Sequence, residues 1–361
     1  MRVVFDNIIF FLQRSGGGTI YWLELIKRAT TDKSIQEYFS EPKLAINNKF
    51  RSELPIKVTF FERAPLLWLR ISNFSKPLQD KFIFHSSYYR ISKSKQAINV
   101  VTVHDFTSEY YLKGIRRLIH KMRKRNAISN AQGIICISHN TKIDLLKMYR
   151  NIDEKLIRVI YNGVSDDYFT ISKTNDFTNF EYPNILKAKY ILYVGHRTNY
   201  KNFFIAVETV ARLDSSYKLL IIGESLSKSE VKIVDKILKN RYICLSGIDN
   251  KTLNIFYNFA YCLIYPSSYE GFGIPLLEAM RASCPVVTTN KSSIPEVVGD
   301  SAVMVSDISS TTFVDAILML SDEKFRSELI LRGLVQSSKF SWDKSYEEVK
   351  KYYVELFNCA E

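Results

Sequence analysis

The sequence predicts an α/β protein with two domains, each built on a parallel β-sheet covered by helices on both faces. Three observations predict this fold class. Short, continuously apolar strands alternate with helical patterns, which is typical of a parallel sheet whose two faces are buried. The same alternation starts again near residue 190. The length of 361 residues is sufficient for two complete hydrophobic cores.

The first domain is expected to span residues 1–165. An apolar run over residues 3–12 is interpreted as a buried first strand, which opens with residues 2–5. The run is too short and too interrupted by polar residues to be a signal peptide. A glycine loop at residues 16–18 follows this run, and residues 19–29 have a helical pattern. Further strands of this domain are expected at residues 99–103, 133–137 and 158–161.

The second domain is expected to span residues 189–340. The segment 166–188 is predicted to be a linker, because it lacks periodicity and is rich in Thr, Asn, Asp and Pro. Residues 342–357 have an amphipathic pattern, so 341–361 is expected to form a C-terminal helix. The predicted strands end at glycine, proline or polar residues, where open α/β sheets bind their ligands. These strands are residues 190–194, 218–222 and 260–265.

The net charge of +13 belongs entirely to the first half of the chain. Residues 1–180 hold 29 Lys and Arg against 16 Asp and Glu, whereas residues 181–361 hold 21 of each. A basic half suits an anionic membrane surface or a polyphosphate acceptor. Nucleic acid is not an expected partner, because the second half is neutral and basic residues do not alternate with aromatic ones as in base-stacking proteins.

The cysteines and the hydropathy pattern indicate a cytoplasmic protein. The five cysteines are scattered and form no C-x-x-C pair, which argues against a disulfide framework or a zinc site. The sequence contains no apolar window of the roughly 20 residues that a membrane span requires.

The stretch from Ser268 to Met280 carries the strongest functional signal. It places Glu270 on a glycine-rich loop and Glu278 in the helix that the loop precedes, with Pro275 suited to the first helical turn. A helix N-terminus attracts anions, so we expect a phosphate site between the two glutamates. Such a layout suits a nucleotide-sugar. The residues whose backbone would form this site are Gly271, Phe272, Gly273 and Ile274.

From Ser268 through Val287 the sequence resembles the signature of retaining glycosyltransferases of family 4. That family has the GT-B fold, in which two Rossmann-like parallel-sheet domains face each other across a cleft. The resemblance implies that Glu270 lies at the donor sugar as a catalytic residue, and that Glu278 holds the ribose hydroxyls. It also implies that the last helix returns to the first domain. One difference is Ser283, where the family usually has glycine.

Two cations follow the first strand of the second half. Arg197 and Lys201 lie four residues apart at a strand-to-helix loop, where cations oppose the helix dipole unless an anion is present. We therefore expect them to bind the donor diphosphate, and the resemblance supports these positions. Glu224, which follows another strand, is expected near the nucleotide base.

His104 and Asp105 follow a buried strand of the first half. A single histidine there could equally be a packed or surface residue. The resemblance implies that this histidine contacts the donor sugar and stabilises developing charge, and Asp105 is expected to orient its ring. The resemblance also implies that the glycine loop, through Gly17 and Gly18, lies against the donor phosphate; three glycines alone could simply form a tight turn.

No cofactor or metal is expected. The sequence contains no Asp-x-Asp, the spacing at which carboxylates hold the Mg²⁺ or Mn²⁺ of a diphosphate. The cations and the helix N-terminus can offset the same negative charge. We therefore expect metal-independent chemistry.

Residues 113–125 contain seven cations and no acidic residue. Their apolar residues share one helical face, which is typical of a helix lying on an anionic membrane and equally of a surface helix packed on its own core. The one-sided charge favours membrane contact. The cations expected to make it are Arg116, Arg117, Lys121 and Lys124.

These observations together predict a retaining glycosyltransferase that moves a hexose-type sugar from a nucleotide-sugar to a glycan acceptor, which we expect to be lipid-linked. The run from Tyr193 to Asn202 resembles bacterial surface-polysaccharide (O-antigen or capsule type) enzymes and favours a mannose-type GDP-sugar. The expected location is the cytoplasm, with peripheral contact at the inner face of the cell membrane. The alternatives are a sugar-nucleotide epimerase or phosphorylase with the same fold, and a basic nucleic-acid-binding protein.

Overall fold

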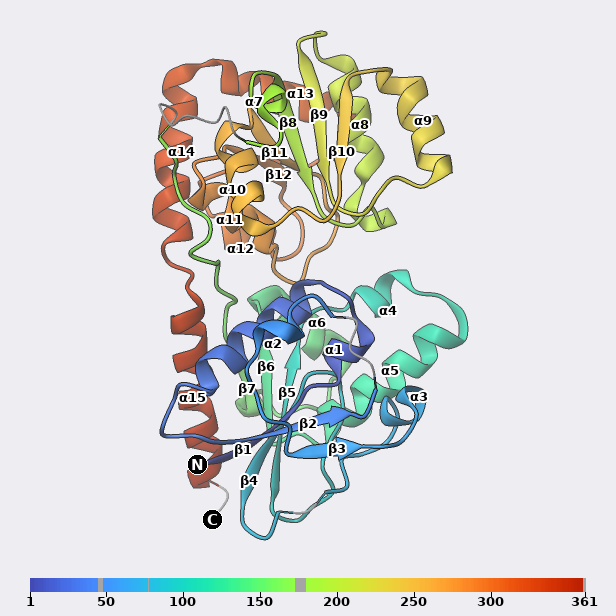
Figure 1. Ribbon diagram of the computed structural model, residues 1–361, viewed down its shortest axis with the longest axis vertical. Helices are drawn as coiled ribbons and strands as arrows, with labels where there is room; N and C mark the ends of the chain where they lie inside the picture. The colour runs from blue at the N-terminus through green and yellow to red at the C-terminus, as the bar shows by residue number, and fades with distance from the viewer. Residues whose placement is uncertain (45–47, 77, 173–179, 360–361) are drawn as a thin grey trace. The chain divides into compact units, whose positions relative to one another are not determined.

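The computed structural model describes residues 1–44, 48–76, 78–172 and 180–359, with the exception of the Arg116 side chain. The chain divides into two compact units. The first unit comprises Met1–Gly163 together with Trp342–Glu361, and the second comprises Val164–Ser341. The predicted α/β class with two parallel sheets is confirmed (Figure 1).

In the described part of the chain, the first unit has a seven-stranded sheet in the order β3-β2-β1-β4-β5-β6-β7, with every neighbouring pair parallel. Its strands are β1 (Arg2–Asp6), β2 (Gln36–Pro42), β3 (Phe60–Glu62), β4 (Phe82–Ser86), β5 (Ala97–Val103), β6 (Gly133–Cys136) and β7 (Ile157–Val159). Its helices are α1 (Ile9–Leu12), α2 (Gly17–Ala29), α3 (Leu66–Leu69), α4 (Thr107–Tyr111), α5 (Gly114–Ser129), α6 (His139–Met148) and α15 (Trp342–Cys359), with 3₁₀ turns at Arg51–Glu53 and Glu154–Leu156.

The second unit repeats this strand order. Its described residues form a six-stranded parallel sheet, β10-β9-β8-β11-β12-β13. The strands are β8 (Lys189–Val194), β9 (Tyr217–Ile222), β10 (Tyr242–Leu245), β11 (Cys262–Tyr265), β12 (Val286–Thr289) and β13 (Val303–Val305). The helices are α7 (Pro183–Leu186), α8 (Phe203–Arg212), α9 (Lys228–Leu238), α10 (Asn250–Phe259), α11 (Ile274–Arg281), α12 (Ile294–Val298), α13 (Ser310–Leu318) and α14 (Glu323–Ser337), with 3₁₀ turns at Asn199–Lys201 and Met319–Ser321.

The order of the strands determines where a ligand can bind in each unit. The chain builds outward in opposite directions from β1 and β4 in the first sheet, and from β8 and β11 in the second. Such a reversal of strand order opens a crevice at the carboxyl ends of the two central strands, which is the usual ligand site of open α/β sheets. Both units therefore present loops for binding after these strands.

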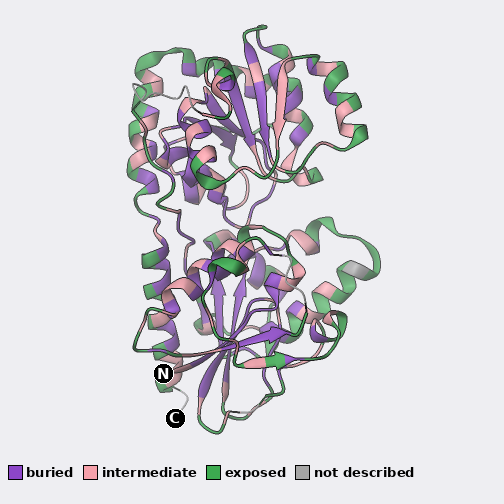
Figure 2. Ribbon diagram, in the orientation of Figure 1, coloured by how far each residue is buried: buried purple, intermediate pink, exposed green. Residues whose placement is uncertain are grey.

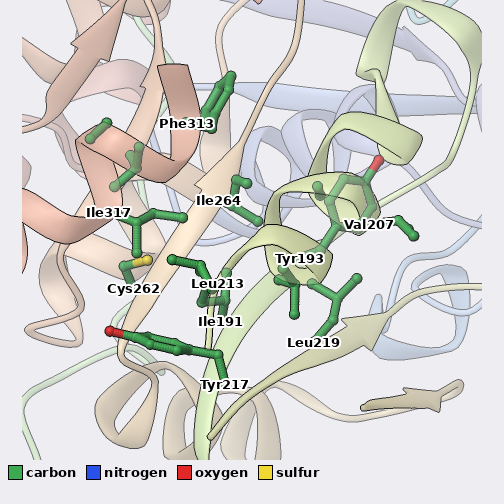
Figure 3. Packing of buried hydrophobic residues seen from close by; sticks show 14 of the residues in the cluster. Ile191, Tyr193, Val207, Leu213, Tyr217, Leu219, Cys262, Ile264, Phe313 and Ile317 are labelled. Atoms are coloured by element: carbon green, nitrogen blue, oxygen red, sulfur yellow. The ribbon is translucent and has the colours of Figure 1, made fainter. Parts of the chain in front are cut away.

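The strands are apolar because both faces of each sheet are covered by helices. Figure 2 shows the strands buried and the outer sides of the helices exposed. In the second unit, α8 and α13 pack on one face of the sheet through a single apolar cluster (Figure 3). Members of this cluster include Ile191, Tyr193, Val207, Leu219, Ile264, Phe313 and Ile317.

The apolar run at residues 3–12 is not one strand. The strand β1 ends at Asp6, and α1 begins at Ile9. The interruption is polar and buried: the Asn7 amide donates to Glu41 Oε1 at 2.8 Å and accepts from Trp22 Nε1 at 2.8 Å. These hydrogen bonds satisfy the side chain at the strand end, so the chain turns there.

The expected linker at 166–188 requires a similar correction. Its described residues belong to the second unit, while residues 173–179 lie outside the described part of the chain. Amides of α10 bind this segment, because Asn254 Oδ1 accepts from the Phe169 N–H at 3.1 Å and Asn258 Oδ1 accepts from the Ile171 N–H at 2.7 Å. The side chains of a folded helix thus fix a segment that has no periodicity of its own.

The C-terminal helix α15 belongs to the first unit. Its Tyr346 hydroxyl donates to Asp32 Oδ2 at 2.9 Å, and Lys350 Nζ lies 2.7 Å from the same carboxylate oxygen. Deeper in the unit, the Tyr353 hydroxyl hydrogen-bonds His85 Nδ1. The helix therefore contributes both to the core of this unit and to its polar contacts.

Candidate active site

The glycine-rich loop lies between β11 and α11, at the crevice of the second sheet. Gly273 is the residue before the helix and has φ +103°, a left-handed conformation that favours glycine. A Cβ at this position would lie 2.9 Å from Leu276 Cδ1. The neighbouring side chains of Phe272 and Ile274 are buried, so this stretch offers a ligand its backbone and not these side chains.

Glu270 is paired with Lys201 within this crevice. Lys201 ends the 3₁₀ turn after β8, and its Nζ lies 2.5 Å from Glu270 Oε1 and 3.1 Å from the Tyr265 hydroxyl. Burial lowers the pKa of Lys201, but the Glu270 carboxylate and the nearby tyrosines outweigh this effect, so its pKa lies well above its usual value. Lys201 is therefore a cation, and its charge is shared with the carboxylate that the sequence analysis placed at the donor sugar.

Two serines that precede α12, Ser292 and Ser293, hold the loop. Ser293 donates its hydroxyl to the carbonyls of Glu270 at 2.9 Å and Phe272 at 3.1 Å. Ser292 Oγ accepts from the Glu270 N–H at 3.2 Å and donates to the Glu270 carbonyl at 2.5 Å. Ser293 precedes α12, but it makes no side-chain capping bond there. The loop conformation thus depends on residues that follow a different strand, β12.

Arg197 is fixed by acidic and carbonyl groups of the same unit. Its Nε lies 2.8 Å from Glu230 Oε1, and its Nη1 and Nη2 donate to the carbonyls of Glu224 at 2.7 Å and Ser225 at 2.9 Å. Burial lowers the pKa of Arg197, but the hydrogen bond and charge of Glu230 raise it above its usual value. The Glu224 side chain itself is 80% exposed.

Glu278 lies in α11 and is buried. The Tyr257 hydroxyl donates to its Oε2 at 3.0 Å, and Tyr168 supplies a second hydrogen bond. Burial raises the pKa of Glu278 to about 7, although both tyrosines act in the opposite direction. In the absence of a ligand, this carboxyl group is therefore partly protonated near neutral pH.

In the first unit, the glycine loop and His104 lie side by side. A Cβ at Gly18 would lie 3.9 Å from His104 Cδ2, whereas a Cβ at Gly17 would meet no atom within 4 Å. The Tyr21 ring of α2 packs edge-on against His104, with ring centroids 5.1 Å apart. The N-terminal turn of α2 and the end of β5 thus form one surface at the crevice of this sheet.

His104 is held as a neutral imidazole. Burial lowers its pKa to about 4; the Asp105 charge raises it and the Lys124 charge lowers it. Burial and the positive charge of Lys124 thus act together to lower the pKa of His104. Near neutral pH the ring can accept or donate a hydrogen bond without carrying a charge.

Asp105 does not orient His104 through a hydrogen bond in the described part of the chain, which corrects the expectation for this residue. Its Oδ1 accepts from the Thr107 N–H at 2.8 Å, and its backbone carbonyl accepts from Lys124 Nζ at 2.8 Å. Asp105 thus binds a backbone donor at the start of α4, a role that short acidic side chains often take.

The cations of α5 do not share one environment. Lys124 is fully buried and pairs with Glu109 at 2.8 Å, so its expected membrane contact is wrong. Arg117 and Lys121 are exposed, and the side chain of Arg116 lies outside the described part of the chain. Lys124 instead points toward the end of β5, where its Nζ donates to the Asp105 carbonyl at 2.8 Å.

The apolar residues of α5 within the segment 113–125 are exposed, which contradicts the alternative that they pack on the core of the protein. Ile115, Leu118 and Met122 have exposed fractions of 66%, 52% and 61%. No helix in the described part of the chain is both long and apolar enough to cross a membrane.

Two doubly wound parallel sheets, each with polar and charged residues at the carboxyl ends of its central strands, define the GT-B fold. The comparisons with known proteins agree. Residues 50–168 match the family model "Glycosyltransferase Family 4", and residues 175–334 match "Glycosyl transferases group 1". The chain is therefore a glycosyltransferase with the GT-B fold.

Individual relatives show which kinds of glycosyltransferase the chain is similar to. The chain is 27% identical to O-antigen chain mannosyltransferase B of Escherichia coli, over 95% of this chain and 97% of that protein. It is 28% identical to the O-antigen chain mannosyltransferase RfbU of Salmonella typhimurium, over 60% of this chain and 59% of that protein. Among solved structures, HepE of Anabaena in complex with UDP-glucose has a TM-score of 0.75 at 15% identity, over 98% of this chain and 100% of that one. The chain thus resembles O-antigen sugar transferases.

Proposed function

We propose that this glycosyltransferase is a retaining enzyme that transfers a mannose-type sugar from a GDP-sugar to a lipid-linked glycan in surface-polysaccharide synthesis. The two similar O-antigen mannosyltransferases support the choice of sugar. The similarity to a structure that holds UDP-glucose supports a nucleotide-sugar donor in general. The preference for GDP rests on the sequence around Arg197.

One observation carries this proposal: Glu270 and Lys201 form a partly buried ion pair at the crevice between β8 and β11. In the proposed complex, the Glu270 carboxylate contacts the donor sugar and Lys201 faces the diphosphate. Fixed charges at such a site stabilise the charge that develops in the transition state, because they need no reorganisation. Glu278 binds the ribose hydroxyls and Glu224 lies near the base.

We propose that the leaving diphosphate is stabilised without a metal. Its charge is offset by Arg197, by Lys201 and by the N-terminus of α11, where the backbone from Gly271 to Ile274 precedes or begins the helix. Arg197 would exchange a contact with Glu230 for one with a phosphate oxygen. His104, as a neutral imidazole, donates or accepts one hydrogen bond at the sugar, and Gly17 and Gly18 leave room for the phosphate.

The acceptor is proposed to be lipid-linked and to be reached at the inner face of the cell membrane. The exposed apolar residues of α5 and the exposed cations Arg117 and Lys121 support this proposal. A basic amphipathic surface of this kind binds anionic lipid through both apolar burial and charge.

A thermal-shift panel with GDP, UDP, ADP and CDP tests the donor. The preferred nucleotide should raise the melting temperature because it binds only the folded protein. Analysis of the product by mass and anomeric configuration then tests the retaining transfer to an added glycan. If none of the four nucleotides shifts the melting temperature, the proposed function is contradicted. If GDP-mannose is consumed without an acceptor and yields another sugar nucleotide, the enzyme is an epimerase.

A further inference from the structure

Two arginines of the first unit lie around one tyrosine ring. Arg70 directly follows α3, Arg123 lies in α5, and Tyr88 follows β4. The guanidinium carbons of Arg70 and Arg123 lie 5.5 Å and 5.2 Å from the centroid of the Tyr88 ring. Arg70 Nη2 also approaches the Tyr88 hydroxyl at 3.4 Å. The ring therefore brings two cations from distant parts of the sequence into one cluster.

Each guanidinium group has at least one N–H without a hydrogen-bond partner among the residues that the structure describes. Arg70 Nε and both Nε and Nη2 of Arg123 are buried without a hydrogen bond, and neither side chain pairs with a described carboxylate. Buried polar groups are nearly always hydrogen-bonded, and a buried charge is costly unless it is paired. This cluster is the exception in a unit whose other buried cations, Arg90 and Lys124, are paired with carboxylates.

The local electrostatics favour an anion between the two arginines. Burial and, to a lesser extent, the charges of Arg70 and Arg90 together lower the pKa of Arg123 to about 10, although Tyr88 acts in the opposite direction. An anion between Arg70 and Arg123 would reverse this effect and provide acceptors for the unpaired N–H groups. Because two guanidinium groups are unpaired, a doubly charged phosphate or diphosphate matches them better than a singly charged phosphodiester.

The cluster lies next to the proposed reaction centre of this unit. Tyr88 comes two residues after β4, at the crevice of the sheet. Arg123 is adjacent in sequence to Lys124, whose Nζ binds the Asp105 carbonyl beside His104. An anion at the cluster would therefore lie on the same edge of the sheet as His104.

An exposed apolar surface flanks the cluster on both sides. We call it the α3–α5 surface. On α3 and just after it, Leu67, Trp68 and Ile71 are 74%, 65% and 59% exposed. The exposed apolar residues on α5 are Ile115, Leu118, Ile119 and Met122. Arg70, just after α3, and Arg123, within α5, pack on the same Tyr88 ring, so α3 and α5 lie near each other; Figure 1 shows the two helices side by side. Exposed apolar area of this extent on a basic domain marks a membrane-binding surface.

We propose that Arg70 and Arg123 bind the phosphate or diphosphate of the lipid-linked acceptor, while the α3–α5 surface rests in the surface of the membrane. The identity of this lipid as the acceptor rests on the function proposed above; the phosphate site itself does not. Trp68 enters the interface, where its ring is favoured. The exposed cations Arg117 and Lys121 interact with anionic headgroups in general.

Vesicle co-sedimentation tests the site. The probes are phosphatidylcholine vesicles alone, with phosphatidylglycerol, or with a polyprenyl diphosphate at matched total charge. The wild-type protein should prefer the diphosphate vesicles over the phosphatidylglycerol vesicles by about tenfold, because charge-assisted hydrogen bonds add to the general attraction. The double variant Arg70→Met/Arg123→Met should lose this preference and retain binding to phosphatidylglycerol vesicles.

The matched control is Arg117→Met/Lys121→Met, which removes two exposed cations from the same region. It should weaken binding to both kinds of anionic vesicle equally and keep the preference. A preference that survives in Arg70→Met/Arg123→Met overturns the proposal, as does a wild-type protein without any preference. If diphosphate and phosphatidylglycerol vesicles bind equally well through this cluster, the site recognises bulk phospholipid and the acceptor assignment is wrong.

Thermal unfolding separates this role from a structural one. Without lipid, Arg70→Met/Arg123→Met should melt at the wild-type temperature or above, because the variant removes buried unpaired charge. A large fall in melting temperature would show that the arginines stabilise the fold and would overturn the proposal. The nucleotide panel is independent of these results. Its failure would contradict the proposed function and leave the lipid phosphate site standing.

Discussion

The two units share the same strand order around their central strands. They differ in how the cations at their crevices are paired. At the crevice of the second unit, Lys201 pairs with Glu270 and Arg197 pairs with Glu230. At the crevice of the first unit, Lys124 is paired with a carboxylate, but Arg123 and Arg70 have no carboxylate partner in the described part of the chain. The difference teaches that the same fold supports one site completed by the protein and another that requires an external anion.

Replacing the best-paired cation of the first unit should produce the largest effect on stability. Arg90 is fully buried and contacts Asp6 at 2.8 Å and Glu62 at 2.7 Å. Arg90→Met would leave two carboxylates buried without a cation, so the free energy of unfolding should fall by about 3–5 kcal/mol in urea titrations. Arg123→Met is the matched control and should leave the free energy of unfolding unchanged. An equal loss in both variants would remove the distinction between paired and unpaired cations.

The pH dependence of stability should reveal the buried carboxyl group of the second unit. The pKa of Glu278 rises from 4.5 to about 7 on folding, so its protonated form is favoured in the folded state. The contribution of Glu278 to the free energy of unfolding is therefore fully present below about pH 4.5. It is lost as the pH rises towards 7, by about 3 kcal/mol in total.

Glu278→Gln tests this, because an amide has the same shape and does not ionise. The difference in unfolding free energy between the variant and the wild type should grow in favour of the variant from pH 4.5 to 7, measured without nucleotide. A difference that is constant across this range would show that Glu278 is ionised in the folded protein. The same variant should bind the preferred nucleotide more weakly.

Glu270→Gln should mainly reduce transfer. The variant keeps the shape of the side chain but removes the charge opposite Lys201, and loss of one fixed electrostatic group typically costs about 10²–10³ in rate. Single-turnover product formation measures the effect, and nucleotide binding should change far less. The exposed Glu208→Gln is the control for loss of one negative charge. A wild-type rate in Glu270→Gln would remove Glu270 from the catalytic site.

The smallest expected effect comes from the serine that supports the loop. Ser293→Ala removes hydrogen bonds to two loop carbonyls, which should cost about 1 kcal/mol of unfolding free energy. Transfer should fall as well, by less than in Glu270→Gln, because the loop loses its support and keeps its carboxylate. The exposed Ser338→Ala should change neither quantity. If both serine variants behave alike, Ser293 does not position the loop.

The parts of the fold that the sequence could predict are those in which local pattern and burial agree. Residues 190–194 are apolar throughout, and residues 99–103 and 218–222 are apolar except for Asn99, Thr102 and Lys218; all three ranges form interior strands of their sheets. The strand β2, with the sequence QEYFSEP, gave no such signal, because it buries Ser40 and Glu41 instead of apolar residues alone. Their partners, Glu62 and Arg51, are distant in sequence, so no local pattern could show the pairing.

The candidate site likewise has features that the sequence could predict and features that it could not. Glycines and a proline placed the loop of Glu270 correctly, because they constrain the backbone locally. The pairing of Glu270 with Lys201 joins residues 69 positions apart and required the structure. The burial of Lys124 was missed because the helical periodicity of α5 does not show which face meets Asp105. The partners of Arg197 and Asp105 were missed for the same reason.

The helix α15 also has a consequence for biosynthesis. The ribosome makes residues 1–163 first, yet His85 and Asp32 complete their contacts only with residues of α15, through Tyr353, Tyr346 and Lys350. The second unit is continuous in sequence and can be completed while the nascent N-terminal segment still lacks a helix. During translation, the first segment to emerge is therefore among the last to reach its final structure.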